Sequence, residues 1–245
     1  MLLEKAIIPG NYKNYVFDLY GTLVDIHTDE NSTILWEKLS MFMGYYAAIY
    51  EADELKTSYE QIVKGFENSY VHEAFPEIDI YDVFEKLYTD KGIEPTRELV
   101  EHTAQFFRIL STEYVKTYPG TREMLTGLKE QGKQIYLLSN AQRLFTAFEM
   151  NRIEILDLFN DVLISSDYKT KKPDRKFFDI LIKKHNIKPE ETLFIGNDSK
   201  TDIAGARMVG FNTFYVNSNI SPQGDSGEEA DYIVENFEKW ETIRK

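Results

Sequence analysis

The sequence predicts an α/β protein with a parallel sheet core and one all-helical domain inserted near its start. Two observations predict this fold class. From Tyr118 onward, short apolar runs alternate with amphipathic stretches, and this rhythm is typical of βαβ units. Between Thr28 and Lys116 the strand pattern is absent, and apolar residues recur at helical spacing instead. We therefore expect a core of residues 1–26 and 117–245 and a helical domain of residues 27–116.

The first predicted strand is the apolar run Tyr15-Val16-Phe17, which leads to Asp18 and a turn containing Gly21 and Thr22. In an open α/β sheet, ligands bind at the end of such a strand, where the N–H groups of the turn can face an anion. An aspartate at this place can act as a nucleophile, as a metal ligand or as both. Taken alone, the pattern would favour an Asp that only caps the turn.

The inserted domain is predicted to contain about four helices. The first is indicated by a stripe of apolar residues, and the next three by similar patterns over Leu55–Tyr70, Ile80–Lys91 and Arg97–Tyr114. Stripes at this spacing usually pack against neighbouring helices, so we expect most of the aromatic side chains to form a core and a minority to face a cleft. The first stripe is Trp36, Leu39, Phe42, Met43, Tyr46, Ile49 and Tyr50.

The second half of the chain is predicted to supply the rest of the sheet and the helices that cover it. The predicted strands are Gln134–Leu138, Val162–Ser165, Thr192–Ile195 and Thr213–Val216, and the predicted helices are Thr121–Gln131, Ala141–Met150, Lys176–His185 and Asp202–Val209. A polar, turn-rich loop over Asn217–Glu229 follows. After it we expect a short edge strand, Ala230–Val234, and a final helix.

Three further motifs accompany Asp18. Ser139-Asn140 follows the second predicted strand, Lys171-Lys172-Pro173 precedes a helix, and a third strand ends in Asp198 and Asp202. Together with the Asp18 segment, these motifs resemble those of the haloacid dehalogenase (HAD) superfamily of hydrolases, in the same order. The resemblance spans most of the chain outside the insertion. It implies a Rossmann-like parallel sheet core with an all-helical cap domain after the first motif.

The resemblance also implies a mechanism and a metal. Asp18 would attack phosphorus to form an aspartyl-phosphate, which water then hydrolyses. The ligands of a Mg²⁺ ion would be the carboxylates of Asp18 and Asp198 and the backbone carbonyl of Tyr20. Asp202 would not bind the ion directly but would orient the residues that do.

The remaining motifs would bind the phosphate group. Ser139 and the N–H groups that follow it, including that of Asn140, would hold phosphate oxygens, and Lys172 would neutralise charge between nucleophile and phosphate. Taken singly, Ser139 would be a strand-end cap and Lys172 a surface lysine. As members of one set, they are predicted to be catalytic and substrate-binding residues.

One position departs from the phosphatase pattern. Phosphatases of this superfamily usually carry an Asp two residues after the nucleophile as general acid and base, and here Tyr20 occupies that place. A phenol with an ordinary pKa of ~10 is a poor base near neutral pH, although it can still donate a proton. Tyr20 is therefore a candidate catalytic residue with a changed role.

Tyr20 also keeps a second enzyme class open. The run Asp-Leu-Tyr-Gly-Thr resembles the first motif of L-2-haloacid dehalogenases, which use the same aspartate to displace halide without a metal. Those enzymes place an arginine early in the cap, whereas no arginine occurs between Asp18 and Arg97, and the acid Asp198 suits a metal site. We therefore favour a magnesium-dependent phosphatase. A dehalogenase and a catalytically weak binding protein remain the alternatives.

Composition narrows the possible partners. The net charge of −13 argues against a nucleic-acid surface, and no apolar run approaches the ~20 residues of a membrane helix. The absence of cysteine excludes disulfides and thiolate metal sites, and the first residues lack the pattern of a signal peptide. We expect a cytoplasmic monomer or homodimer that acts on a small phosphorylated substrate and binds neither nucleic acid nor membrane.

Overall fold

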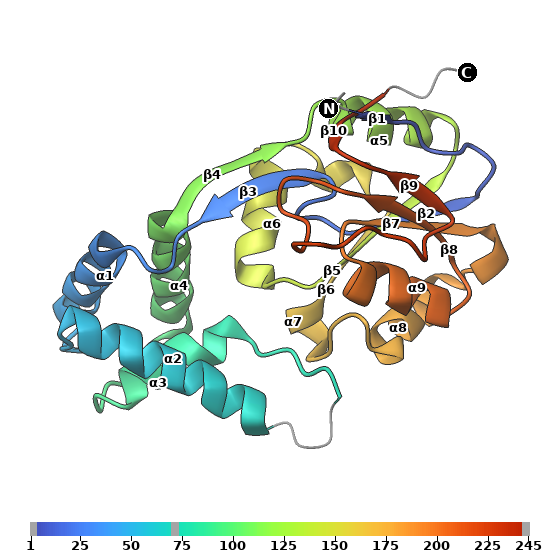
Figure 1. The fold of residues 1–245 in the computed structure, drawn as a ribbon. Helices are drawn as coiled ribbons and strands as arrows, with labels where there is room; N and C mark the ends of the chain where they lie inside the picture. The colour runs from blue at the N-terminus through green and yellow to red at the C-terminus, as the bar shows by residue number, and fades with distance from the viewer. Residues whose placement is uncertain (1–3, 70–73, 242–245) are drawn as a thin grey trace.

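The computed structural model describes residues 4–69 and 74–241. Within these ranges the chain forms a parallel sheet flanked by helices and a separate helical cap (Figure 1). The six-stranded sheet has the order β6-β5-β2-β7-β8-β9, and every neighbouring pair is parallel. The strands are β2 (Asn14–Phe17), β5 (Gln134–Ser139), β6 (Asp161–Ile164), β7 (Thr192–Gly196), β8 (Asn212–Val216) and β9 (Tyr232–Val234).

The central position of β2 decides where the site forms. Tyr15 pairs with Ile135 of β5 on one side and with Leu193 of β7 on the other. Because parallel strands end at the same edge, the residues that follow β2, β5 and β7 come together there. The predicted parallel sheet, with the Asp18 strand at its centre, is therefore confirmed.

Both faces of the sheet are covered, as expected for parallel strands. Alternate strand residues pack on one side against α5 (Thr121–Glu130) and α6 (Arg143–Arg152). On the other side they pack against α8 (Arg175–His185) and α9 (Ala204–Met208). A π-helical turn, Ser199–Ile203, precedes α9 and occupies the start of the helix predicted over Asp202–Val209, and the short α7 (Ser165–Tyr168) was not predicted.

The cap is helical, as predicted. Its helices are α1 (Thr33–Tyr45), α2 (Ala52–Ser69), α3 (Ile80–Thr89) and α4 (Arg97–Ser111). They bury a core of their own whose centre is aromatic, so the expectation that the stripes pack against sister helices holds. Within that centre, Trp36, Tyr59, Phe84 and Phe107 have ring centroids 5.2–5.8 Å apart.

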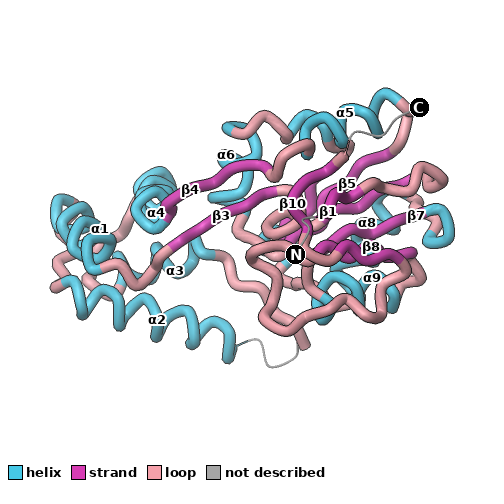
Figure 2. The backbone as a smooth tube through the Cα atoms, turned by 45° about the horizontal axis from the view of Figure 1, so that its top comes forward, coloured by secondary structure: helices cyan, strands magenta, loops and turns pink. Residues whose placement is uncertain are grey.

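An antiparallel ribbon joins the cap to the core (Figure 2). It consists of β3 (Val24–Thr28) and β4 (Thr112–Thr117), so the helix predicted to reach Tyr114 ends at Ser111 instead. Pairing between segments almost ninety residues apart decides this, and helical spacing in one segment cannot reveal it. The domain boundaries predicted at 26/27 and 116/117 fall inside this ribbon.

The final helix predicted after Val234 is wrong. The chain there forms β10 (Phe237–Trp240), which pairs in parallel with β1 (Glu4–Ala6). Trp240 is buried, and its ring N–H donates to the carbonyl of Thr22 at 3.2 Å. Tertiary burial of this aromatic residue overrides the local preference.

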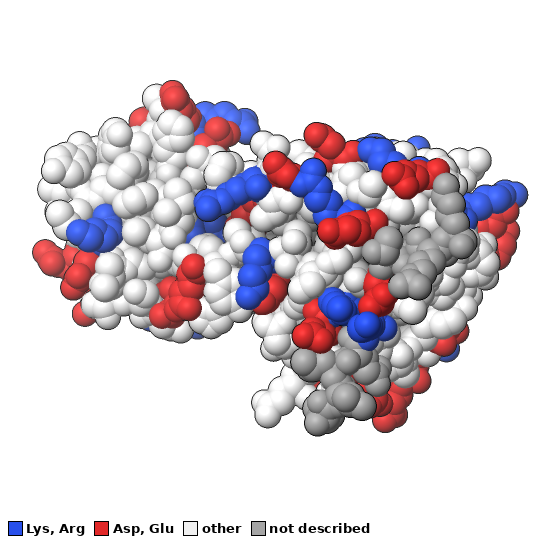
Figure 3. All heavy atoms as spheres, turned by 90° about the horizontal axis from the view of Figure 1, so that it is seen from above, with Lys and Arg blue, Asp and Glu red and all other residues white. Residues whose placement is uncertain are grey.

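The surface carries both signs of charge. Figure 3 shows lysine and arginine interspersed with aspartate and glutamate over the core, with fewer charges at the far end of the cap. Within residues 4–69 and 74–241, no helix is both long enough and apolar enough to cross a bilayer.

Candidate active site

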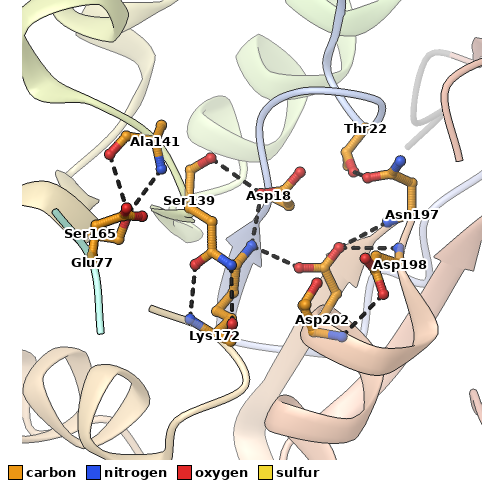
Figure 4. Close-up of polar contacts among 12 residues, drawn as sticks. Asp18, Thr22, Glu77, Ser139, Ala141, Ser165, Lys172, Asn197, Asp198 and Asp202 are labelled. Carbon is orange, nitrogen blue, oxygen red and sulfur yellow. Dashed lines mark hydrogen bonds and ion pairs between the residues drawn. The ribbon is translucent and has the colours of Figure 1, made fainter. Parts of the chain in front are cut away.

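The candidate site lies at the edge of the sheet where β2, β5 and β7 end. A cavity of about 230 Å³ opens there, and all the predicted site residues line it. Figure 4 shows Asp18, Ser139, Lys172 and Asp202 coming from separate segments and meeting around the Lys172 ammonium. The predicted site residues that line the cavity are Asp18, Tyr20, Ser139, Asn140, Lys172, Asp198 and Asp202.

Lys172 is the charged centre of the site. Its Nζ donates to Asp18 Oδ1 at 2.7 Å and to Asp202 Oδ1 at 2.6 Å, and the residue is only 2% exposed. Burial alone would lower the pKa of this amine, but the two carboxylates outweigh burial and raise it. Lys172 is therefore a buried cation directly beside the proposed nucleophile.

Two side chains hold Lys172 and Asp18 in place. The amide of Asn140 accepts from the backbone N–H of Lys172 at 2.8 Å and donates to the Lys172 carbonyl at 3.0 Å. Ser139 Oγ donates to Asp18 Oδ1 at 3.1 Å. The Asn140 side chain, for which the sequence predicted no separate role, thus positions the segment that carries the lysine.

Asp202 shapes the loop after β7. Its Oδ2 accepts from the backbone N–H groups of Asn197 at 3.0 Å and Asp198 at 3.2 Å. A Cβ at Gly196 would lie 2.4 Å from the same oxygen, so only glycine allows this close approach. Burial raises the pKa of the Asp202 carboxyl above its usual range, although Lys172 opposes the shift.

Asn197 joins this loop to the first motif. Thr22 Oγ1 donates to its side-chain oxygen at 3.3 Å, and its amide covers Gly21, which has a φ of +85°. A Cβ on Gly21 would lie 2.2 Å from the Asn197 nitrogen. Asn197 therefore docks on the turn after Asp18.

The donor atoms left around the cavity suit a hard cation. Asp18 and Asp198 each use Oδ1 for hydrogen bonds, Asp198 accepting from the N–H groups of Lys200 and Thr201 at 2.7 and 3.0 Å. Neither Oδ2 has a hydrogen bond to the described residues. No three acidic or histidine side chains in the described ranges form a metal cage. The ligands predicted for Mg²⁺ are two carboxylates and the backbone carbonyl of Tyr20. Mg²⁺ prefers oxygen ligands of this kind.

Tyr20 belongs to a network that the sequence did not reveal. Its hydroxyl donates to Glu149 Oε2 on α6 and lies 3.2 Å from Thr146 Oγ1. Glu149 Oε1 accepts from Arg108 Nε on cap helix α4 at 2.7 Å. Burial, with Glu149 adding to it, raises the pKa of the Tyr20 phenol, so the phenol stays neutral and donates.

Sequence reasoning missed both Arg108 and Glu149. The only local signal was a glutamate on the buried face of the helix predicted over residues 141–150, beside Phe145 and Thr146. The dehalogenases place an arginine early in the cap, whereas Arg108 lies on the last cap helix. Its charge is paired with that of Glu149. No spacing rule connects residues on separate domains.

A match to a family model identifies the family. The model of the haloacid dehalogenase-like hydrolases matches residues 12–210. The chain belongs to this family. As a HAD-like hydrolase it carries the four motifs on the strand ends and loops described above, so the predicted family and enzyme class are confirmed.

Curated relatives of this HAD-like hydrolase include enzymes of both candidate classes. Glyceraldehyde 3-phosphate phosphatase from Pyrococcus furiosus is 32% identical over 123 residues, which is 49% of this chain and 51% of the relative. The chain thus spans about half the length of the first curated relatives it matches. (S)-2-haloacid dehalogenase 4A from Burkholderia cepacia is 24% identical over 213 residues, 84% of each chain.

Solved structures confirm the fold of this HAD-like hydrolase. The 2-haloacid dehalogenase from Pseudomonas syringae superposes with a TM-score of 0.61 at 19% identity, covering 91% of this chain and 94% of that one. The YfnB protein from Bacillus subtilis, solved bound to magnesium, has a TM-score of 0.54 at 19% identity with the same coverage. At these identities the likeness concerns the fold alone.

Proposed function

We propose that this HAD-like hydrolase is a magnesium-dependent phosphatase that acts on a small phosphorylated metabolite through an aspartyl-phosphate. One observation carries the proposal. The buried ammonium of Lys172 donates to Asp18. Asp18 and Asp198 line the same cavity, and one carboxylate oxygen of each has no hydrogen bond to the described residues. This arrangement can neutralise a dianionic phosphate beside a carboxylate nucleophile.

The reaction uses groups of this chain in two steps. A carboxylate oxygen of Asp18 forms a bond to phosphorus, and the bond from phosphorus to the ester oxygen breaks with its electron pair. The leaving oxygen takes a proton from water. A second water then attacks the phosphorus, releases inorganic phosphate and restores the Asp18 carboxylate.

The neighbouring residues position these groups. Lys172 holds Asp18 and would neutralise the phosphate oxygens, and the backbone N–H of Asn140 would donate to them. The Ser139 hydroxyl, which donates to Asp18 in this structure, would turn its single donor to a phosphate oxygen. A magnesium ion held by Asp18, Asp198 and the Tyr20 carbonyl would supply further charge neutralisation. Asp202 keeps both Lys172 and the Asp198 backbone in place.

A second candidate, 2-haloacid dehalogenase activity, is favoured by Tyr20 and by the match over 84% of a haloacid dehalogenase. In that reaction Asp18 would displace halide at carbon to form an ester, which water then hydrolyses. Two features oppose it: a carboxylate on the cavity at Asp198 without a role, and a cap arginine whose charge Glu149 already pairs. A catalytically weak binding protein is the third candidate, supported by Tyr20 alone.

Substrate assays with purified protein test the proposal. We expect Mg²⁺-dependent release of phosphate from para-nitrophenyl phosphate and acetyl phosphate, and loss of that release in EDTA. The variant Asp18→Asn keeps the shape of the side chain but removes the anionic nucleophile, so release should fall to background. Chloride release from 2-chloropropionate without phosphate release would overturn the phosphatase in favour of the dehalogenase.

A further inference from the structure

A second cavity adjoins the site, between cap and core. Its volume is about 390 Å³, and Tyr20 and Asn140 line both it and the Asp18 cavity. A phosphate held at Asp18 would therefore direct its organic group into this space. Apolar side chains such as Tyr59, Ile78 and Phe145 form part of its wall.

The charged groups of this second cavity are mostly negative. Glu30, Glu67 and Glu77 line it. Glu77 is only 8% exposed and its carboxyl accepts from Ser165 Oγ at 2.7 Å. Burial raises the pKa of the Glu77 carboxyl, although the hydrogen bond from Ser165 opposes the shift. Glu30 and Glu67 are exposed to solvent.

The positive charge on this lining is already paired. Among the described residues that line the second cavity, Arg108 is the one basic side chain. Its guanidinium donates to both oxygens of Glu149, at 2.7 and 3.4 Å, and Glu149 is buried. Among the described lining residues, a second anionic group of a substrate would therefore meet carboxylates and no unpaired basic side chain.

We infer that the second cavity selects phosphate monoesters whose organic part carries no negative charge. The inference rests on the proposed phosphatase function and names the substrate class of that same site. Bringing a carboxylate into a partly enclosed cavity beside other carboxylates costs both desolvation and repulsion, whereas a hydroxyl or an ammonium group avoids that repulsion.

Three esters of matched length test this inference. Phosphoglycolate, 2-hydroxyethyl phosphate and phosphoethanolamine differ only in ending with a carboxylate, a hydroxyl or an ammonium group. With Mg²⁺, we expect kcat/KM for phosphoglycolate to lie at least tenfold below that for 2-hydroxyethyl phosphate, with phosphoethanolamine no lower than the latter. Titration calorimetry with the Asp18→Asn variant should give the same order of Kd values, which reports binding without turnover.

Variants locate the effect. In the double variant Glu30→Gln/Glu67→Gln, the ratio between 2-hydroxyethyl phosphate and phosphoglycolate should shrink several-fold. Glu238→Gln, an exposed glutamate on β10 outside the cavity lining, should leave the ratio as in the wild type.

The outcomes separate the two proposals. Equal kcat/KM for the three esters, or a preference for phosphoglycolate, would overturn the inference and leave the phosphatase standing. Absence of turnover on all three esters and on para-nitrophenyl phosphate would overturn both.

Discussion

Replacing Lys172 with methionine is expected to destabilise the protein through the charge that it leaves behind. Methionine keeps much of the apolar stem but removes the ammonium that pairs with Asp18 and Asp202 at 2.7 and 2.6 Å. Removing one partner of a buried ion pair costs about 3–5 kcal/mol. Both carboxylates line the same cavity, but Asp202 is 1% exposed and Asp18 is 7% exposed, so the uncompensated charge is mainly that of Asp202.

We therefore expect the low end of that range, about 3 kcal/mol. For a chain of 245 residues this corresponds to a fall in Tm of about 6–12 °C, measured by calorimetry or circular dichroism. The double variant Lys172→Met/Asp202→Asn should melt above the single variant, because the asparagine oxygen can still accept the N–H groups of residues 197 and 198 while the charge is gone. Lys183→Met, at an exposed position on α8, is the control and should change the free energy of unfolding by less than ~0.5 kcal/mol.

Two results would refute this reasoning. One is a Tm of Lys172→Met within about 2 °C of the wild type, which would mean that the buried pair does not hold the site together. The other is a further loss of Tm when Asp202→Asn is added to Lys172→Met. In that case the Asp202 charge would be compensated by some group other than the lysine.

Three other predictions concern residues around the site and on the core surface. Tyr20→Asp should raise turnover on alkyl phosphates by roughly tenfold, because a carboxylate then stands in the acid–base position, and a fall on every ester with unchanged Tm would contradict this. A double-mutant cycle between Arg108→Ala and Glu149→Gln in urea unfolding should show a coupling of about 0.5–3 kcal/mol, and additivity would mean that their contact does not stabilise the cap on the core. Burial alone would raise the pKa of Asp161, but hydrogen bonds from Lys184 and His185 outweigh it and lower that pKa. The free energy of unfolding, measured by urea titration, should be higher for the wild type than for Asp161→Asn by less than ~1 kcal/mol at pH 6. This difference should vanish by about pH 2–3, where the carboxyl is protonated. A difference that stays constant across this pH range would exclude the ion pair as its source.

Local chemistry in the sequence was enough for much of the fold. Apolar runs that end in Asp18, Ser139 or Asp198 predicted three adjacent strand ends, because a buried parallel strand needs a continuous apolar segment and a polar residue marks where it emerges. The cap helices were predictable from their apolar spacing, because each helix buries one stripe of apolar side chains. Element type and the members of the Asp18 site were therefore predictable from short segments.

The errors occurred where burial or pairing depends on a distant segment. Residues 112–114 were predicted to end a cap helix and Phe237–Trp240 to lie in a final helix, yet both belong to strands that pair with partners far along the chain. The backbone N–H of Asn140 was predicted to bind phosphate, but no role was predicted for its side chain. In the folded chain the side-chain amide holds the backbone of Lys172, because the loop after α7 returns beside the end of β5.

The sequence by itself determined the family, the sheet strands and seven of the side chains that line the Asp18 cavity, since the motifs and strands each lie within one short segment. The tertiary structure alone decided that Lys172 pairs with two carboxylates, that Tyr20 donates to Glu149, and that Arg108 reaches this pair from the cap. It also decided the charge around the second cavity, because that lining is assembled from cap and core residues far apart in the chain. Hydrogen bonds and ion pairs act over a few ångströms in space, and only the packing of the two domains brings these groups within that range.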